Sequence, residues 1–403
     1  MRCKVLILST DLSGGGAEYV ARLMSDRIEQ SICILFENKK NIAPEKSLLY
    51  VLPGSKIDQR LFTLARNILR LTYIQIIKAA SRPLITISHL EGPNIANLLS
   101  IGGGHRCIFV HNKLSSNYAG SQRFDKLKLF LAKILYQKAN LVVGVSKEIC
   151  REMVEDYGVN EERVQYLANP IDTKKIKELA QNRFSDDRDC IFGARYVVNV
   201  ANFIEQKNHE FLIEVYRRVI ESQTDLKLVL LGDGEKKCHI KNICIEKGMV
   251  INDLTENDFN SDAQVYFLGF QTNPYPFVQH SQLFILTSYW EGLPIAVLEA
   301  MCLGKSLVLT DCSSAVREIM LGSDKDIDWL RRDEAIRTDY GYILQNPGET
   351  KELLNYDLWE QAINTIVLDD RFRRDCEKAA TTYAQYHDIS ILEERWGKLF
   401  ARL

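Results

Sequence analysis

Short apolar runs alternate with amphipathic helical stretches along most of this chain, and that alternation limits the possible folds more than any other feature. It begins with "CKVLILSTDLSGGGAEYVARLM", which predicts a buried strand, a glycine-rich turn and a helix from about Ala17. Strand-like runs follow at 31–36, 84–88, 107–110 and 141–145, with helical stretches between them. Strands that alternate with helices form a mainly parallel sheet covered on both faces. The predicted fold class is therefore α/β.

The same alternation starts again after a polar segment, "DTKKIKELAQNRFSDDRD", which follows Ile171. Here the pattern predicts strands at 196–200, 226–232, 265–267, 283–286 and 306–309, and helices at 209–221 and 294–302. We therefore expect two doubly wound, Rossmann-like domains, an N-terminal one at 1–180 and a C-terminal one at 181–385. Ligands of such sheets bind outside the carboxyl ends of the strands, so two such domains facing each other form a cleft.

Composition excludes several classes of protein. Apolar residues make up 46% and charged residues 26%, which is ordinary for a globular chain and unlike a disordered, collagen-like or coiled-coil protein. Apolar runs such as "LVVGV" fall far short of the roughly 20 residues of a membrane-spanning helix. The apolar start, "VLIL", is too short for a signal peptide. Ten cysteines form no C-x-x-C pair, which favours reduced thiols in a cytoplasmic protein.

The string "SYWEGLPIAVLEAMCLG" contains the most informative candidate site. Pro294 suits the first position of a helix, so the amides of Ile295 and Ala296 are free to bind an anion at the positive end of the helix dipole. Glu291 precedes this helix and Glu299 lies one turn into it. Carboxylates there can accept hydrogen bonds from the hydroxyls of a sugar and of a ribose. The alternative is a surface helix with ordinary glutamates.

This string resembles the E-x7-E motif of retaining glycosyltransferases with the GT-B fold, in particular glycosyltransferase family four. In that family the first Glu lies beside the donor sugar and the second holds the donor ribose, which implies these roles for Glu291 and Glu299. "VVNVANFIEQKNHEFLIEVYRRV" resembles the segment whose lysine clamps the donor diphosphate, here Lys207. "LVLLGDGE" and "VYFLGF" resemble the glycine turn and the strand edge beside the nucleobase. They imply donor contacts at Gly232 and Leu268.

One position departs from the family pattern. The family commonly has Gly-Arg before the lysine, and that arginine also touches the diphosphate, whereas this chain has Ala201 and Asn202. An asparagine can donate a hydrogen bond to the donor but brings no charge. Either Lys207 and the helix start bind the phosphates alone, or another cation compensates.

The N-terminal half offers further candidates. In "SGGGAEYV", Gly15 and Gly16 let the backbone approach an anion at a helix start, and the loop resembles the family's glycine loop facing the donor phosphates. A tight turn is the alternative. His111 follows the strand "CIFV", where the family often has a histidine that contacts the donor sugar; a loop histidine bonded to backbone is the alternative. His89 and Asn112 are expected on the acceptor side.

The charge is divided unevenly. Residues 1–180 hold 26 basic and 17 acidic residues, a net charge of +9, and the rest carries −11. The basic excess concentrates in the stretches 56–82 and 113–138, which mix cations with Leu, Ile, Phe and Tyr as interfacial helices do on anionic lipid. A solvated helix face is the alternative for either stretch. Nucleic acid is not expected as a partner, because no recognised nucleic-acid module occurs.

Together these features predict a retaining glycosyltransferase, cytoplasmic and peripheral on the inner face of the membrane. It would move a hexose from a nucleotide diphosphate sugar, a UDP-sugar, to a lipid-linked glycan in cell-surface polysaccharide or glycolipid synthesis. The resemblance implies no metal and no cofactor, the nucleotide sugar being a co-substrate. It also implies that 386–403 packs back on the N-terminal domain. Two alternatives remain: a nucleotide-sugar epimerase or hydrolase of the same fold, and a catalytically decayed protein that binds sugar nucleotides.

Overall fold

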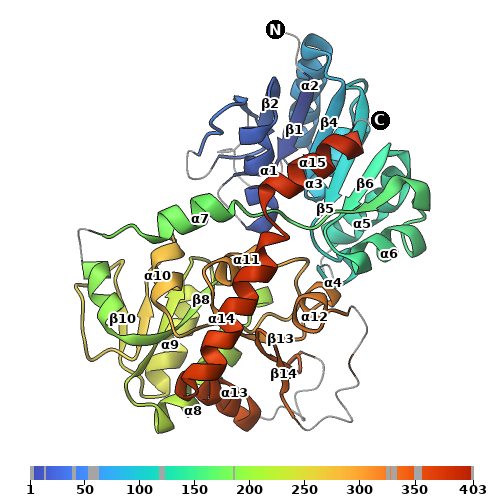
Figure 1. Ribbon diagram of the computed structural model, residues 1–403. Helices are drawn as coiled ribbons and strands as arrows, with labels where there is room; N and C mark the ends of the chain where they lie inside the picture. Colours follow the sequence, from blue (N-terminus) through green and yellow to red (C-terminus); the bar gives the residue numbers. More distant parts are fainter. Residues whose placement is uncertain are drawn as a thin grey trace. The chain divides into compact units, whose positions relative to one another are not determined.

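The computed structural model divides the chain into two compact units, each built on its own sheet (Figure 1). The first unit comprises the residues up to Asn169 and those from Glu394 on, and the second runs from Pro170 to Glu393. The sequence pattern predicts these boundaries after residues 180 and 385. The structure describes residues 4–12, 15–38, 42–52, 63–117, 123–184, 187–323, 327, 334–348 and 356–400.

Within the described residues the first unit holds a seven-stranded parallel sheet in the order β3-β2-β1-β4-β5-β6-β7. Its elements are β1 (Val5–Ser9), α1 (Gly16–Arg27), β2 (Ser31–Leu35), β3 (Leu48–Val51), α2 (Thr63–Ser81), β4 (Ile85–His89), α3 (Glu91–Leu99), β5 (His105–Val110), α4 (Leu114–Asn117), α5 (Arg123–Leu135), β6 (Leu141–Gly144), α6 (Lys147–Glu155) and β7 (Val164–Tyr166). The strand order reverses between β1 and β4, so their carboxyl ends border the crevice where such sheets bind ligands.

The second unit holds an eight-stranded sheet in the order β10-β11-β9-β8-β12-β13-β15-β14, in which only β14 runs antiparallel to its neighbour among the described strands. Its elements are α7 (Thr173–Ala180), β8 (Arg195–Val200), α8 (His209–Ser222), β9 (Leu226–Leu231), α9 (Lys237–Glu246), β10 (Ile251–Asp253), β11 (Val265–Phe267), α10 (Tyr275–His280), β12 (Leu283–Leu286), α11 (Ile295–Cys302), β13 (Ser306–Thr310), α12 (Ser314–Leu321), β14 (Ile336–Thr338), β15 (Gly341–Leu344), α13 (Tyr356–Leu368), α14 (Asp370–Gln385) and the start of α15 (Ile389–Phe400). In this sheet the order reverses between β8 and β12.

The predicted α/β class with two doubly wound sheets is confirmed. The predicted strands are present with ends that differ by one or two residues, because strand ends depend on pairing that an apolar run does not specify. Short strands such as β10 and β14, each of three residues, show too little periodicity to be predicted. Helix α11 begins at Ile295, because Pro294 has an extended ψ of 107° and precedes the first helical residue.

The core of the second unit lies where helices cover the apolar strands. Leu228 and Leu230 of β9 are fully buried, as are Val215 of α8 and, within 2% exposure, Trp359 of α13. Each fully buried side chain of this size stabilises the fold by about 1.5–3 kcal/mol relative to an exposed one. The apolar layers hold the strands rigidly, so the loops at their carboxyl ends start from defined positions.

Two of these loops in the second unit touch backbone to backbone. Gly232 follows β9 with φ +149°, and a Cβ atom there would lie 1.9 Å from the carbonyl oxygen of Ala201. A Cβ on Gly234 would lie 2.5 Å from the carbonyl oxygen of Phe203. Only glycine at these two positions allows the loop after β9 to lie against the segment 201–203.

We expect Gly232→Ala to destabilise the protein by about 3 kcal/mol or more, since backbone strain and overpacking each cost about 1–3 kcal/mol. Gly248→Ala is the matched control, because Gly248 also has a positive φ, +76°, but has no atom within 4 Å of its Cβ position. Urea unfolding of both variants measures the difference. Equal losses of stability in the two variants would contradict the backbone contact.

Candidate active site

The strongest candidate site lies at the strand-order reversal of the second sheet. Lys207 follows β8 and Glu291 follows β12, and these two strands are neighbours in the sheet. The ammonium of Lys207 forms an ion pair and hydrogen bond with Oε1 of Glu291. Two residues 84 positions apart in the chain are thus brought into direct contact.

Glu291 is held by more than its ion pair. The hydroxyl of Ser288 donates a hydrogen bond to Oε1 of Glu291 at 2.7 Å, and Nε2 of Gln206 lies 3.4 Å from Oε2. The Glu291 side chain is 7% exposed and that of Lys207 is 19% exposed. The carboxylate is therefore stabilised in a nearly buried place, while the ammonium remains partly open to a ligand.

Hydrogen bonds to backbone carbonyls tie the two loops together around this pair. The amide of Tyr289 donates to the carbonyl of Gln206 at 2.8 Å, and Nε2 of Gln206 donates to the carbonyl of Trp290 at 2.7 Å. The hydroxyl of Thr287 donates to the carbonyl of Asn208 at 3.2 Å. These contacts fix the position of Lys207 before any ligand binds.

The start of helix α8 fixes the backbone directly after the lysine. Lys207 ends a short 3₁₀ turn, and Asn208 follows with φ +48°, a left-handed conformation that asparagine tolerates. The Oδ1 atom of Asn208 accepts a hydrogen bond from the amide of Phe211 at 3.4 Å and caps α8. The chain therefore turns sharply at residue 208, directly after the lysine.

Three other predicted donor-binding residues lie at the same edge of the second sheet. Asn202 is exposed in the loop after β8, beside the close-packed Gly232. Leu268 directly follows β11, is 2% exposed, and its amide donates to the carbonyl of Leu230 at 3.0 Å. Its side chain is therefore part of the core, and only its backbone lies at the edge.

The start of α11 lies a few residues beyond Glu291. Pro294 caps the helix without a side-chain hydrogen bond, and its carbonyl accepts from the amide of Val297 at 3.1 Å. Ile295 is buried and Ala296 is half-buried. The carboxylate of Glu299 accepts a hydrogen bond from the hydroxyl of Tyr275 at 2.8 Å. The predicted ribose-binding residue thus already has a protein partner.

The glycine loop of the first unit carries negative charge. The amide of Gly15 donates to the carboxylate of Glu18 at 3.1 Å, which is one half of a capping box at the start of α1, since glycine has no side chain to supply the other half. Burial raises the pKa of Glu18, and the carboxylates of Asp11 and Glu91 raise it further. Three carboxylates near this helix start oppose a phosphate at Gly15 and Gly16. Gly14, which belongs to the same predicted loop, lies outside the described residues.

The predicted histidines of the first unit contact each other. Nδ1 of His89, the last residue of β4, lies 2.9 Å from Nε2 of His111, which directly follows β5. Burial lowers the pKa of both rings, that of His111 to about 3, so both are neutral at pH 7. Asn112 is half-buried next to His111.

Residues that the sequence analysis did not select complete these arrangements. Gln206 and Ser288 bind Glu291, and Tyr275 binds Glu299. Ser288 stands three positions before Glu291 within the motif, and Gln206 is next to Lys207, but no spacing distinguishes them from ordinary loop residues. Tyr275 offers no signal in the sequence. Its contact depends on how α10 packs against α11.

Within the described residues, no group of three or more His, Cys, Asp or Glu side chains is arranged to hold a metal ion. An ammonium and a buried carboxylate side by side can bind a ligand that carries both an anion and hydroxyls. The ammonium attracts phosphate oxygens, and the carboxylate accepts hydrogen bonds from hydroxyls or opposes a developing positive charge.

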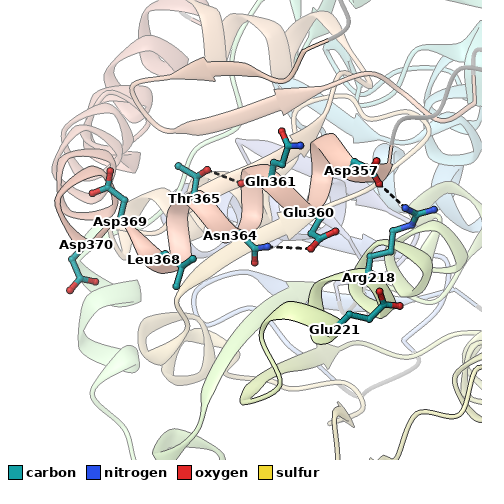
Figure 2. A pocket seen from close by; sticks show the side chains of 10 residues that line it. All are labelled: Arg218, Glu221, Asp357, Glu360, Gln361, Asn364, Thr365, Leu368, Asp369 and Asp370. Atoms are coloured by element: carbon teal, nitrogen blue, oxygen red, sulfur yellow. Dashed lines mark hydrogen bonds and ion pairs between the residues drawn. The ribbon is translucent and has the colours of Figure 1, made fainter.

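A groove of about 1020 Å³ lies elsewhere in the second unit, between the C-terminal half of α8 and helix α13 (Figure 2). It is lined by Arg218 and Glu221 of α8 and by side chains of α13 and the following turn, most of them acidic or amide. Arg218 forms an ion pair with Asp357 across it at 2.7 Å. None of the predicted site residues lines this groove, so it is separate from the candidate site.

Comparisons with known proteins agree with the fold and the motifs. A model described as "Glycosyl transferases group 1" matches residues 194–334, and one described as "Glycosyltransferase Family 4" matches residues 14–175. The structure is similar to that of Anabaena Alr3699/HepE in complex with UDP-glucose, with a TM-score of 0.73 at 18% sequence identity over 99% of this chain and 100% of that one. The fold is therefore GT-B.

Curated relatives are glycosyltransferases by name. An uncharacterised glycosyltransferase of Methanocaldococcus jannaschii is 28% identical over 63% of this chain and 62% of its own length. The N-acetylgalactosamine-N,N'-diacetylbacillosaminyl-diphospho-undecaprenol 4-alpha-N-acetylgalactosaminyltransferase of Campylobacter jejuni is 25% identical over 74% of this chain and 71% of its own. The chain belongs to the GT-B glycosyltransferases of the family four type.

A third buried histidine stands beside the candidate site. His209, the first residue of α8, is 3% exposed and its ring stacks on Phe203 with centroids 4.3 Å apart. Burial and the neighbouring charge of Lys207 lower its pKa to about 3. His89, His111 and His209 are therefore all neutral in the folded protein at pH 7.

We expect stability to fall as pH falls below about 6.5. In that range the unfolded chain protonates these histidines and the folded protein does not, until pH approaches 3 for His111 and His209. One such histidine accounts for about 2 kcal/mol between pH 7.5 and pH 5. Urea unfolding at both pH values measures the free energy of unfolding. Between pH 7.5 and pH 5 the His209→Phe variant should lose about 2 kcal/mol less stability than the wild type. An identical pH dependence in the two proteins would contradict a neutral His209.

Proposed function

We propose that this protein is a retaining glycosyltransferase that moves a hexose from a UDP-sugar to a lipid-linked glycan acceptor. The Lys207–Glu291 pair carries the proposal, since it places an ammonium and a stabilised carboxylate where a sheet of this kind binds its ligand. Support for the donor comes from the similar fold of the Anabaena protein, whose structure contains UDP-glucose. Support for the acceptor comes from the Campylobacter relative, whose name specifies a diphospho-undecaprenol substrate.

Each residue has a defined part in the proposed reaction. The bond between the sugar C1 and the diphosphate oxygen breaks, and its electron pair leaves with the diphosphate. The acceptor oxygen forms the new bond to C1 on the same face, and its proton passes to the released diphosphate. Lys207 and the amides of Ile295 and Ala296 stabilise the charge on the diphosphate, which preorganised donors do well. Glu291 opposes the positive charge that develops on the sugar, and no metal or cofactor takes part.

The proposal is tested by NMR of the purified protein with a panel of nucleotide sugars, with and without a membrane lipid extract from the source cells and in the presence of EDTA. We expect one UDP-sugar to be consumed only when lipid is present, giving an α-linked glycolipid. Conversion of a donor without lipid would indicate an epimerase or hydrolase. Tight donor binding without turnover on any acceptor would indicate a decayed scaffold.

Lys207→Ala should lower turnover by about 100-fold or more, as expected when a charged donor to the leaving group is removed. Asn202→Ala should have little effect, because the Asn202 side chain is exposed and uncharged. Lys247→Ala is the matched control, since Lys247 also pairs with a glutamate, Glu214, in the same unit but away from this edge. Steady-state kinetics with the identified donor compares the three, and equal effects of the Lys207 and Asn202 variants would contradict the proposed clamp.

We further propose that the enzyme docks on anionic lipid through α5. Leu127, Phe130 and Ile134 recur at helical spacing on its surface with exposed fractions of 52%, 61% and 45%. Exposed lysines, Lys126 and Lys133 among them, flank this row. An apolar row bordered by lysines fits a bilayer surface with anionic headgroups. Among the described residues no helix is long and apolar enough to cross a membrane.

The first basic stretch contributes less than its composition suggests. Arg70 and Lys78 of α2 are 6% and 2% exposed, and Lys78 donates to Oδ1 of Asn97 at 2.8 Å. Burial lowers the pKa of Lys78 to about 7. The outer side of α2 carries Ile68 and Ile76 instead, both more than half exposed. Residues 56–62 of the first stretch and 118–122 of the second lie outside the described residues.

Phe130→Glu should weaken binding to phosphatidylglycerol-containing vesicles by about tenfold or more, since burying a phenylalanine side chain contributes about 1.5–3 kcal/mol. Ile245→Glu is the control, because Ile245 is similarly exposed, at 57%, on α9 of the other unit. Vesicle co-sedimentation at low and high salt measures both. If the two variants bind like the wild type, α5 is not the docking surface.

A further inference from the structure

One oxygen of the Glu291 carboxylate has two donors of different kinds. Oε1 accepts a hydrogen bond from the hydroxyl of Ser288 at 2.7 Å and also contacts the ammonium of Lys207. Within the described residues the other oxygen, Oε2, has only Nε2 of Gln206, at 3.4 Å, which is long for a hydrogen bond. The carboxylate therefore depends chiefly on the two donors of Oε1.

Ser288 is the fixed member of these two donors. It is 0% exposed, and its carbonyl accepts a hydrogen bond at 2.8 Å from the hydroxyl of Thr310, the last residue of β13, which is also 0% exposed. Strand β13 neighbours β12, so the turn that contains Ser288 is fastened to a third strand besides β8 and β12. A short side chain enclosed in this way has little freedom to move.

The ammonium of Lys207 is the movable donor. The lysine side chain is 19% exposed, and its charge ends a flexible four-carbon stem. An ammonium has three N–H donors, and among the described residues its one hydrogen-bond partner is Glu291. The remaining donors are open to a ligand. A diphosphate carries more charge than one carboxylate, so it attracts the ammonium more strongly at the same distance.

Movement of the ammonium toward a phosphate removes a charge partner from Glu291. A carboxylate that is 7% exposed is stable without that partner only if other donors stay in place. The hydroxyl of Ser288 can stay, because its position depends on Thr310 and not on Lys207.

We infer that Ser288 is a positioning residue, which keeps Oε1 of Glu291 in place while the ammonium of Lys207 turns from this carboxylate to the phosphate of a bound ligand. The inference rests on the proposed function in taking the ligand to carry a diphosphate. It makes Glu291 and the ligand competitors for one ammonium. Without the Ser288 hydroxyl, Oε1 would depend on Lys207 alone, and the ammonium would be released less readily.

The first test is calorimetric titration of the full chain with UDP, repeated with inorganic pyrophosphate. Neither probe has a sugar for Glu291 to contact, so their binding reports on the ammonium. Glu291→Gln removes the competing charge and should tighten the binding of both probes by about fivefold or more. Ser288→Ala should weaken it by about threefold or more. Equal or tighter binding by Ser288→Ala would overturn the inference.

A double-mutant cycle shows whether Ser288 acts through Glu291. In the Glu291→Gln background, Ser288→Ala should change the affinity for UDP and pyrophosphate by less than about twofold. The same loss in both backgrounds would contradict a role through the carboxylate. Ser306→Ala is the matched control, because Ser306 is also 0% exposed but donates to the carbonyl of Arg373 at 3.3 Å, at the amino end of β13. Thermal melting of all variants identifies any loss of fold.

Turnover separates the inference from the proposed function. Ser288→Ala should lower kcat on the order of 10- to 100-fold, as losses of supporting hydrogen bonds around a functional group do, whereas Ser306→Ala should leave kcat unchanged. If sugar is transferred and the two variants behave alike, Ser288 has no positioning role and the proposed function stands. If UDP and pyrophosphate bind as expected but no sugar is transferred, the proposed function fails and the inference stands. Absence of binding to both the wild type and Glu291→Gln would overturn the inference.

Discussion

A carboxylate as buried as that of Glu291 is stable only when it is paired and hydrogen-bonded, and the architecture of the second unit meets that requirement. Lys207, Ser288 and Gln206 supply the donors. They can do so because β8 and β12 are neighbours, and because the loops after them are joined by hydrogen bonds to backbone carbonyls. The sheet order, the two loops and the start of α8 thus depend on one another through this contact.

The polar groups at the carboxyl edges of the two sheets differ in charge and in how they are paired. The second unit keeps opposite charges in contact, which binds anions and hydroxyls but requires a precise set of donors. The first unit has two neutral rings that share one proton, and carboxylates at its glycine loop. A phosphate is favoured beside Lys207 and disfavoured beside Glu18. The carboxyl edge of the second sheet is therefore the one suited to an anion, whereas that of the first sheet offers neutral rings and carboxylates.

The alternation of apolar runs was sufficient to predict the class of fold and most strands, because burial on both faces leaves a strong pattern. Lys207 and Glu291 were selected from motifs, but their contact depends on strand order, which a single sequence does not show. The contacts of Gln206 and Tyr275 depend on side-chain orientation and on helix packing. Neither of these leaves a spacing pattern in the sequence. Composition also misjudged α2: the period of its apolar residues does not reveal that Arg70 and Lys78 face inward.

Backbone contact and the buried ring of Phe203 hold the segment that contains Asn202. Gly232 and Gly234 lie against the carbonyls of Ala201 and Phe203, while the Asn202 side chain takes no part in that contact and is exposed. The shape of the loop is therefore independent of which side chain stands at 202. In evolutionary terms, the side chain at 202 can change, to a cation as well, while the backbone contact that shapes the loop remains.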